Sequence, residues 1–460
     1  MTPTTPERYR SVAERSWRWV LDQVRWDDGP WIPPSADASP EPAWDRDGMH
    51  SGIGGLAHAL AEIRAVRPWT AEEDRLAAGI GDRLRSVIPA HSDCSFFDGL
   101  GSMVGALVAL RQPGADAAVA RLATLAGADG WPQTTMGPPR YLAGARINDL
   151  TLGTAGVLAS ALWAMTHDVP EAREVAEHAA TVLLAEEDPR DVGSTWPFVP
   201  VRFRTDPDVQ MPNLSHGVAG VAAALAAAGA VLERPDLSAA ALRGAEHLVS
   251  LADTAGDGFL VPIEVPSRPR DRDEVTYTWC HGPTGTSLLF LALQVAGVQE
   301  VAGEATGSWH RRCLHSVRTS GVPNRLYPGF WDNDGRCCGT AGVGAVFLDS
   351  WHCSGDDGDL TFAVELADAL LDRAVSEGPH TYWRFVEHRA EEPLLPPGVG
   401  WMQGAAGIAG FLFRLSHLLE QGRESVPLGR MDTWWALPMD PLTRTAAAHR
   451  SSTPPGPALQ

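Results

Sequence analysis

The sequence predicts an all-α protein built as an α/α toroid, with seven inner and seven outer helices. Three observations carry this prediction. A glycine-headed motif occurs seven times along the 460-residue chain, each copy leads into an apolar run, and amphipathic segments lie between the copies. The copies start about 47 to 65 residues apart, which leaves room for two helices per repeat and is typical of repeat architectures. Strand patterns are few.

Each copy of the motif consists of a polar residue followed by Gly-x-x-Gly. Two copies are imperfect: the second has Ser102 where the last glycine should be, and Leu152 heads the third. Glycines allow sharp backbone turns and close helix packing, so each copy is expected to start a helix that lies against its neighbours. The first glycines of the seven copies are Gly52, Gly99, Gly153, Gly217, Gly282, Gly339 and Gly404.

The helical segments are of two kinds, which differ in polarity. Runs such as 157–163 and 221–226 are rich in alanine and apolar on most sides, as expected for buried inner helices. Segments 171–186, 238–252 and 360–377 are more amphipathic and fit outer helices with one wet face. An open helical solenoid would suit the same pattern, but reactive residue types concentrate at the motif heads, which favours a closed ring with a common centre.

Two stretches interrupt the repeat, and the end of the chain differs in composition. Residues 189–213 fit a short hairpin or a loop over the mouth of the ring, and the proline- and charge-rich residues 262–277 lead to the fifth copy. We expect residues 1–437 to form a single α/α-toroid domain. Residues 438–460, rich in Pro, Ser, Thr and Ala, are expected to be a disordered tail, with Trp434-Trp435 pinning it or serving an interface.

Composition and charge exclude several classes of protein. The formal net charge of −20 argues against nucleic-acid and anionic-membrane partners, since both need clustered positive charge. All 37 basic residues are arginine, so Schiff-base, P-loop and kinase-type lysine chemistry is excluded. We find no run long enough for a membrane span and no signal peptide. We therefore expect a cytoplasmic protein, whose cysteines bind metal rather than form disulfides.

Three of the six cysteines lie at two motif heads. Cys280 precedes the fifth copy, and the adjacent Cys337 and Cys338 precede the sixth. Three thiolates supply three soft ligands and leave a fourth position open, as in a catalytic zinc site, whereas a structural zinc site uses four. The cysteines alone would fit buried thiols as well as a metal site. Their matching positions in the repeat favour Zn²⁺.

Two histidines and one aspartate are the candidate acid–base residues. His216 and His281 head two neighbouring copies, one residue before the glycine. A single histidine at a helix start is usually a capping or core residue, but two at equivalent positions that converge with the cysteines fit proton transfer. Asp149 lies just ahead of the third copy, where it could orient a histidine or cap the helix.

Together these motifs resemble the LanC-like family, the lanthionine synthetase C cyclases, over roughly residues 50–418. The resemblance rests on the seven repeats combined with Trp279-Cys280-His281-Gly282 and Cys337-Cys338-Gly339. It implies an α/α toroid with a zinc ion at its mouth, and it matches the family's first two zinc cysteines to Cys280 and Cys337. The third ligand is often histidine in relatives, so Cys338 resembles the three-cysteine branch.

The resemblance also implies roles for the other candidates. His216 matches the histidine of the family's His-Gly motif, Asp149 matches its aspartate before the third repeat, and His281 takes a position held by tyrosine or histidine. The implied activity is the addition of a peptide cysteine thiolate to dehydroalanine or dehydrobutyrine, which gives lanthionine or methyllanthionine. His216 or His281 would act as the general acid and Asp149 would orient or charge-balance the histidine.

One position departs from the family pattern. Many of these cyclases carry an arginine four residues before the first zinc cysteine, where this chain has Thr276. Either another arginine, such as Arg272 or Arg204, takes its place, or substrate handling differs.

Three other functions remain open at this point. A related enzyme would use the same site to add a free thiol such as glutathione to dehydroamino acids, and a non-catalytic member of a biosynthetic complex would only bind peptide. An α/α-barrel glycoside hydrolase would use Asp149 and Glu264 as acid and base, but it gives the cysteines no role. The expected partner is a dehydrated precursor peptide, with dehydratase, kinase or lyase steps supplied by separate proteins.

Overall fold

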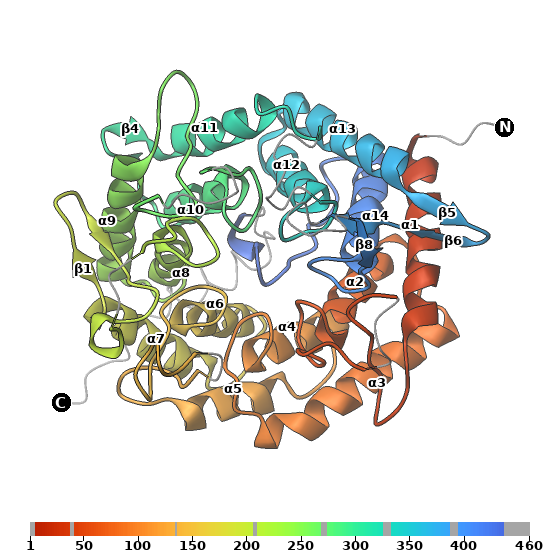
Figure 1. Cartoon of the computed structure of the whole chain (residues 1–460), viewed down its shortest axis with the longest axis horizontal. Helices are drawn as coiled ribbons and strands as arrows, with labels where there is room; N and C mark the ends of the chain where they lie inside the picture. The colour runs from red at the N-terminus through yellow and green to blue at the C-terminus, as the bar shows by residue number, and fades with distance from the viewer. Residues whose placement is uncertain are drawn as a thin grey trace, which may run out of the picture.

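The structure is a computed structural model that describes residues 5–36, 41–133, 136–205, 209–267, 274–324, 333–386 and 394–436. Within these residues, fourteen α-helices form two concentric rings, seven inside and seven outside (Figure 1). The predicted α/α toroid is therefore confirmed.

The inner ring is closed. Its helices are α2 (Ile53–Val66), α4 (Leu100–Leu110), α6 (Thr154–Met165), α8 (Val218–Val231), α10 (Pro283–Val295), α12 (Thr340–Ser354) and α14 (Ala405–Gln421). Each packs against the next along the chain, and α14 packs against α2, which excludes the open solenoid. All seven start at the same end of the ring, which we call the mouth, and the space that they enclose is the bore.

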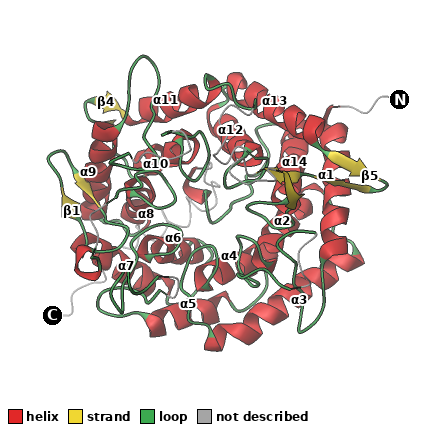
Figure 2. Cartoon of the chain, viewed as in Figure 1, coloured by secondary structure: helices red, strands yellow, loops and turns green. Residues whose placement is uncertain are grey.

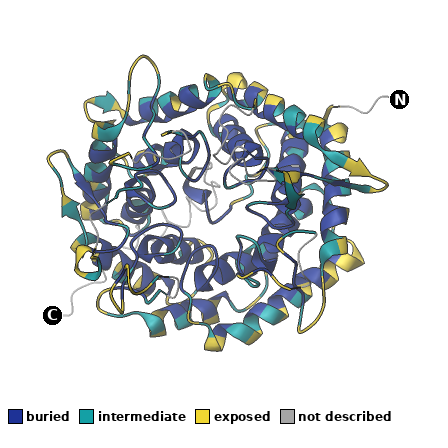
Figure 3. Ribbon diagram, viewed as in Figure 1, coloured by how far each residue is buried: buried dark blue, intermediate teal, exposed yellow. Residues whose placement is uncertain are grey.

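The outer ring covers the inner one. Its helices are α1 (Thr5–Gln23), α3 (Ala71–Val87), α5 (Ala115–Leu125), α7 (Ala172–Ala185), α9 (Pro235–Leu251), α11 (Thr306–Arg318) and α13 (Asp357–Arg373). Each packs on the inner helix that precedes it, except α1, which packs on α14. Exposed residues gather on the outward faces, and the inner helices are largely buried (Figure 3). The three predicted outer segments are confirmed as α7, α9 and α13.

The first glycine of every motif copy caps an inner helix. At Gly217, as at the six equivalent positions, the backbone is extended (φ −133°, ψ −167°), a conformation open to any residue. The requirement for glycine comes from close approach instead, since a Cβ at Gly217 would lie 1.7 Å from the carbonyl oxygen of Met211. The last glycine of a copy is crowded in the same way, with 1.8 Å between a Cβ at Gly285 and the carbonyl oxygen of Trp279.

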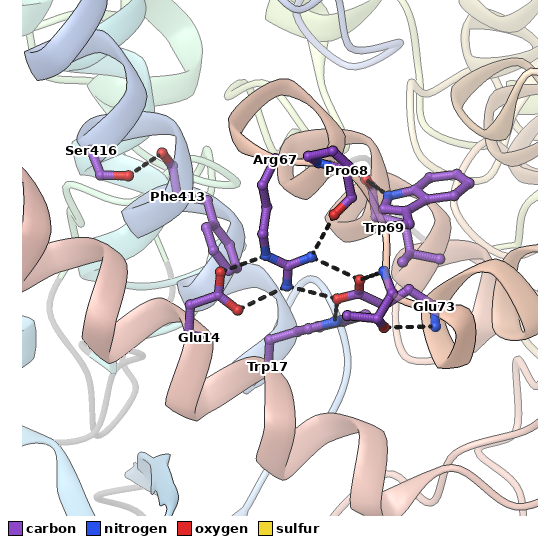
Figure 4. Close-up of polar contacts among 10 residues, drawn as sticks. Glu14, Trp17, Arg67, Pro68, Trp69, Glu73, Phe413 and Ser416 are labelled. Atoms are coloured by element: carbon purple, nitrogen blue, oxygen red, sulfur yellow. Dashed lines mark hydrogen bonds and ion pairs between the residues drawn. The ribbon is translucent and has the colours of Figure 1, made fainter.

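A buried carboxylate joins the first helix to the rest of the ring. Glu73, only 1% exposed, accepts a hydrogen bond from Trp17 Nε1 of α1 at 2.8 Å. Arg67 donates to the same carboxylate at 2.8 and 2.9 Å and also to Glu14 of α1 (Figure 4). Thr70 completes a capping box with Glu73 at the start of α3. These contacts hold α1 in place as the seventh outer helix.

Strands are few in the described part of the chain, as predicted (Figure 2). They form four antiparallel pairs: β1 (Asp188–Pro189) with β2 (Ser194–Thr195), β3 (Glu300–Val301) with β4 (Glu304–Ala305), β5 (Val375–Glu377) with β6 (His380–Tyr382), and β7 (Arg384–Val386) with β8 (Leu394–Pro397). The first pair is a hairpin at the start of the predicted 189–213 interruption. Helix α13 ends at Arg373 and residues 375–377 form strand β5, so the end of the outer helix predicted over 360–377 was wrong.

The chain after α14 runs into the bore (Figure 1), where residues 434–436 pack against α10 and α12. We call residues 427–436 the C-terminal segment. Trp434 and Trp435 are buried there, and Trp435 Nε1 donates to the carbonyl oxygen of Leu288 in α10 at 3.3 Å. Met431 is fully buried against Gly105 of α4. This burial fits a pinning role for the two tryptophans; the predicted tail, 438–460, lies outside the described residues.

Candidate active site and metal centre

Backbone hydrogen bonds link six of the seven pairs of neighbouring motif heads around the mouth. Side chains link the third head to the fourth, through Asp149 and His216. Cys280 N donates to the carbonyl oxygen of Cys337 at 3.2 Å, and Cys337 N donates to that of Met402 at 2.8 Å. The ring closes where Met402 N, of the last copy, donates to the carbonyl oxygen of His50, of the first, at 3.0 Å. Head residues that are far apart in the sequence therefore converge on one centre. The other bonds of this kind are Met49 to Phe97, Phe96 to Thr151 and Ser215 to Cys280.

The three predicted metal ligands lie together in this ring. The Sγ atoms of Cys280, Cys337 and Cys338 all lie within 4.8 Å of one another. Cys338 Sγ is 3.2 Å from that of Cys280 and 3.1 Å from that of Cys337. Cys280 and Cys338 are buried, and Cys337 is partly exposed toward the mouth. Three thiols at these separations can share one ion.

The thiols differ in their readiness to ionise. Burial by itself would raise the pKa of Cys280, but hydrogen bonds from Cys337 and Cys338 and the nearby His281 outweigh it and lower that pKa well below its usual range. The hydrogen bond to Cys280 raises the pKa of Cys337, and burial raises that of Cys338. One thiolate thus suppresses the ionisation of the other two. A divalent cation would remove this conflict, so the donor set fits zinc.

Among the described residues, no His, Asp or Glu joins the cysteines as a further ligand. The described protein ligands therefore number three, all soft sulfur donors. A zinc ion held by three protein ligands keeps a fourth position for a substrate or water. This count distinguishes a catalytic site from a structural one.

His216 is held by a buried carboxylate. Its Nδ1 donates to Oδ2 of Asp149 at 2.6 Å, and Asp149 is 0% exposed while the His216 side chain is 27% exposed. Thr151 Oγ1 donates to the same carboxylate oxygen at 2.7 Å and lies 3.0 Å from His216 Nδ1. The contact fixes Nδ1 as the protonated nitrogen and leaves Nε2 for chemistry. The other oxygen of Asp149 accepts from Leu152 N, and since Gly153 caps α6, Asp149 is not a helix cap.

His281 lies beside His216. The two ring centroids are 5.5 Å apart, and the planes are inclined at 45°. His281 is partly exposed and follows Cys280 directly in the chain. The His216 ring also forms a T-shaped contact with the ring of Phe198, at 5.6 Å between centroids. The predicted acid–base candidates are therefore brought together next to the cysteines.

Thr276 marks the position at which this chain lacks the family's arginine. Thr276 is buried, and its carbonyl oxygen crowds Gly282, the cap of α10. Of the two replacements considered, Arg272 lies outside the described residues. Arg204 forms a backbone bridge with Tyr141, in the pair of loops that also carries Phe198.

Two residues at the site were missed from the sequence. His50 takes the same place in the first copy, two residues before the capping glycine, that Cys280 and Cys337 take in theirs. Its Nδ1 lies 2.9 Å from Ser51 Oγ, and burial lowers its pKa to about 4, with a partly opposing charge on Cys280. That shared register could have identified it. Arg336, directly before Cys337, carries no such signal and is described below.

Comparisons with known proteins agree with this arrangement. The family described as lanthionine synthetase C-like protein matches residues 43–424, while no curated protein sequence matches the chain. Among solved structures, a nisin cyclase aligns over 82% of this chain and 90% of its own, with 14% identity and a TM-score of 0.54.

Two family 76 glycoside hydrolases of Bacteroides thetaiotaomicron are also similar in structure. One is an α-mannanase with 12% identity and a TM-score of 0.50, covering 90% of this chain and 96% of its own. The other is a mannosidase with 11% identity and a TM-score of 0.51, covering 90% and 99%. At such identities the structures show a shared fold alone, whereas the family match spans most of the sequence. The chain belongs to the lanthionine synthetase C-like family.

Proposed function

We propose that this protein is a zinc-dependent lanthipeptide cyclase, which joins cysteine thiols of a dehydrated precursor peptide to its dehydroalanine or dehydrobutyrine residues. The observation that carries the proposal is the grouping of Cys280, Cys337 and Cys338 beside His216, whose orientation Asp149 fixes. Family membership and a nisin cyclase of the same fold support it. A glycoside hydrolase function is less well supported than a cyclase function, because Asp149 is fully buried and hydrogen-bonded to His216.

Cys280, Cys337 and Cys338 would hold the zinc. When bound there, zinc would supply a site at which a substrate thiol loses its proton at neutral pH. The mouth is the entrance to this site, since the C-terminal segment occupies the bore on the other side. The thiolate then adds to the β-carbon of the dehydroamino acid, and negative charge develops toward the α-carbon and its carbonyl.

His216 Nε2 would donate the proton that the α-carbon needs to complete the thioether. The buried Asp149 accepts the Nδ1 hydrogen bond and so holds the ring with Nε2 available for this transfer. His281, 5.5 Å away between ring centroids, is the second candidate for the same role. Each cycle forms one C–S bond and one C–H bond, and the proton that leaves the thiol balances the proton that the carbon receives.

Two alternatives use the same site. A free thiol such as glutathione could replace the peptide cysteine, and a non-catalytic member of a biosynthetic complex would bind peptide without adding thiols. A dehydrated precursor peptide distinguishes them by mass spectrometry: cyclisation leaves the mass unchanged and removes the free thiol, glutathione addition increases the mass, and a binding protein changes neither. Separate dehydratase, kinase or lyase proteins would act on the same peptide.

The first experiment is the zinc content of the purified protein beside that of Cys280→Ala. We expect about one zinc per chain in the wild type and a large loss in the variant, with both proteins helical by circular dichroism. A well-folded wild type that takes up no zinc would refute the mechanism. Zinc uptake without ring formation on a competent precursor would instead favour the binding-protein alternative.

A further inference from the structure

The C-terminal segment occupies the bore next to the motif heads that carry Cys280, Cys337 and Cys338. Among its residues Arg430, Met431 and Asp432 are 0 to 5% exposed. The cavity between Asp432 and the mouth-side residue Trp279 has a volume of only about 10 Å³, about the space that one water needs. A cavity of this size is too small to hold a substrate segment. The segment also lies beyond residue 424, where the match to the family ends.

Six buried charges hold this segment in place. Arg430 of the segment contacts Asp349 of α12 at 2.7 Å and Glu62 of α2 at 3.5 Å. Arg414 of α14 reaches the same two carboxylates at 2.7 and 3.5 Å. Arg430 also lies 3.6 Å from Asp432. The sixth charge is Arg336, so three arginines face three carboxylates.

Arg336 connects this network to the metal ligands. Its guanidinium lies 3.7 Å from Asp432 and 4.4 Å from the ring centroid of Trp401, and the side chain is 6% exposed. Its backbone N donates to the carbonyl oxygen of Met402 at 2.8 Å, and Cys337 N donates to the same oxygen. The side chain and the backbone of Arg336 therefore both hold the turn that carries Cys337.

We propose that Asp432 and Arg336 are positioning residues for the metal centre: the C-terminal segment sets the geometry of the Cys337–Cys338 turn from below. The inference rests on the proposed function, since it assumes that these cysteines bind zinc. Loss of the Asp432 carboxylate leaves a buried guanidinium without its partner. Arg336 then moves, and the turn moves with it. Groups that orient metal ligands in this indirect way typically affect metal affinity by about 10- to 100-fold.

The test compares Asp432→Asn, Arg336→Gln and Arg336→Lys with the wild type in the full chain. Zinc affinity is measured by competition with a chromophoric chelator, and the geometry of the site by the thiolate-to-metal absorption of the Co²⁺ form. We expect zinc affinity to fall about tenfold or more in Asp432→Asn and Arg336→Gln, with a changed Co²⁺ spectrum. Arg336→Lys, which keeps the charge, should recover part of the affinity.

Glu73→Gln supplies the matched control. It also removes a buried charge paired with an arginine, but outside the bore (Figure 4). It should lower the melting temperature. Its zinc affinity should stay within about twofold of the wild-type value, and its Co²⁺ spectrum should be unchanged. The inference is overturned if Glu73→Gln weakens zinc binding as much as Asp432→Asn does at the same loss of melting temperature, or if all three site variants bind zinc as the wild type does.

A third readout separates this inference from the proposed function. The alkylation rates of Cys337 and Cys338 in the metal-free protein report the position of the turn by mass spectrometry. We expect Asp432→Asn to change them severalfold and Glu73→Gln to leave them alone. If the wild type binds zinc but forms no rings, the cyclase proposal fails while the affinity test stands. If it binds no zinc, the inference about a metal centre fails as well, and the alkylation comparison then decides only whether the C-terminal segment sets the position of the turn.

Discussion

His216 Nδ1 lies 2.6 Å from a carboxylate oxygen of Asp149 that has no solvent exposure at all. The bond determines which imidazole nitrogen is available for proton transfer. Asp149→Asn keeps the size of the side chain but removes the carboxylate that holds the imidazole in one orientation, so we expect kcat for cyclisation to fall by about 10² to 10⁴. Zinc content should be unchanged. Single-turnover kinetics on a dehydrated peptide measure the step.

Thr151→Val is the control for this prediction. It removes a hydroxyl donor from the same carboxylate oxygen but leaves the Asp149–His216 bond in place. Its effect on kcat should be about tenfold or less. A variant Asp149→Asn with the kcat of the wild type would contradict the role given to His216 and move it to His281.

The third thiolate should make the substrate sulfur more reactive. Zinc held by Cys280, Cys337 and Cys338 would carry a net negative charge, which would weaken its hold on a further thiolate and preserve that thiolate's nucleophilicity. We therefore expect Cys338→His to retain zinc but to form rings about tenfold more slowly than the wild type. Metal analysis and cyclisation rates of the same preparation test this. Equal or faster turnover in the variant would refute the argument.

A pair of buried carboxyl groups should make stability depend on pH. Burial and the neighbouring Asp45 raise the pKa of Asp98 to about 8 from an ordinary value of 3.8. The folded state therefore holds a proton that the unfolded state has lost, and the stability that this proton contributes is present below about pH 4 and is lost as pH rises through 8. The slope from one such group is at most about 1.4 kcal/mol per pH unit.

Asp98→Asn has no titratable group at this position. Its free energy of unfolding should therefore fall less between pH 5 and 8 than that of the wild type. Urea titrations at a series of pH values give the comparison. Parallel curves for the two proteins would show that Asp98 is ionised in the folded state.

The capping glycines should tolerate no side chain. Gly217→Ala would push a Cβ to within 1.7 Å of a backbone oxygen, and we expect a loss of about 3 kcal/mol or more in the free energy of unfolding. Gly137 has nothing within 4 Å of its Cβ position, so Gly137→Ala should change stability by less than about 0.5 kcal/mol. Thermal denaturation distinguishes the two, and equal effects would contradict the close-approach explanation.

The sequence predicts the ring and most of the mouth because both follow from local pattern. Alanine-rich runs, amphipathic partners and glycine caps repeat at a regular spacing, and Cys280 and Cys337 share one register within that repeat. The same register would have identified His50. The need for the capping glycines was harder to predict, since close contact with backbone about six residues earlier, rather than an unusual φ, makes them necessary.

Long-range contacts could not be predicted in this way. Asp432 meets Arg336 across almost one hundred residues of chain, and neither belongs to a repeated pattern. Residues 427–436 follow no repeated pattern, and only the charged side chains of the inner helices explain why Arg430 and Asp432 are buried there. The pairing of Asp149 with His216 depends in the same way on the third and fourth turns being neighbours.

The contact between α1 and α14 also determines the order in which the protein can fold. Helix α1 leaves the ribosome long before α14, so the inner face of α1 and the gap beside α2 stay open until α14 has been made. Contacts this distant in sequence are slow to form, and apolar surface that waits for them invites aggregation. Translation that stops before residue 405 should therefore leave an unclosed horseshoe that depends on chaperones.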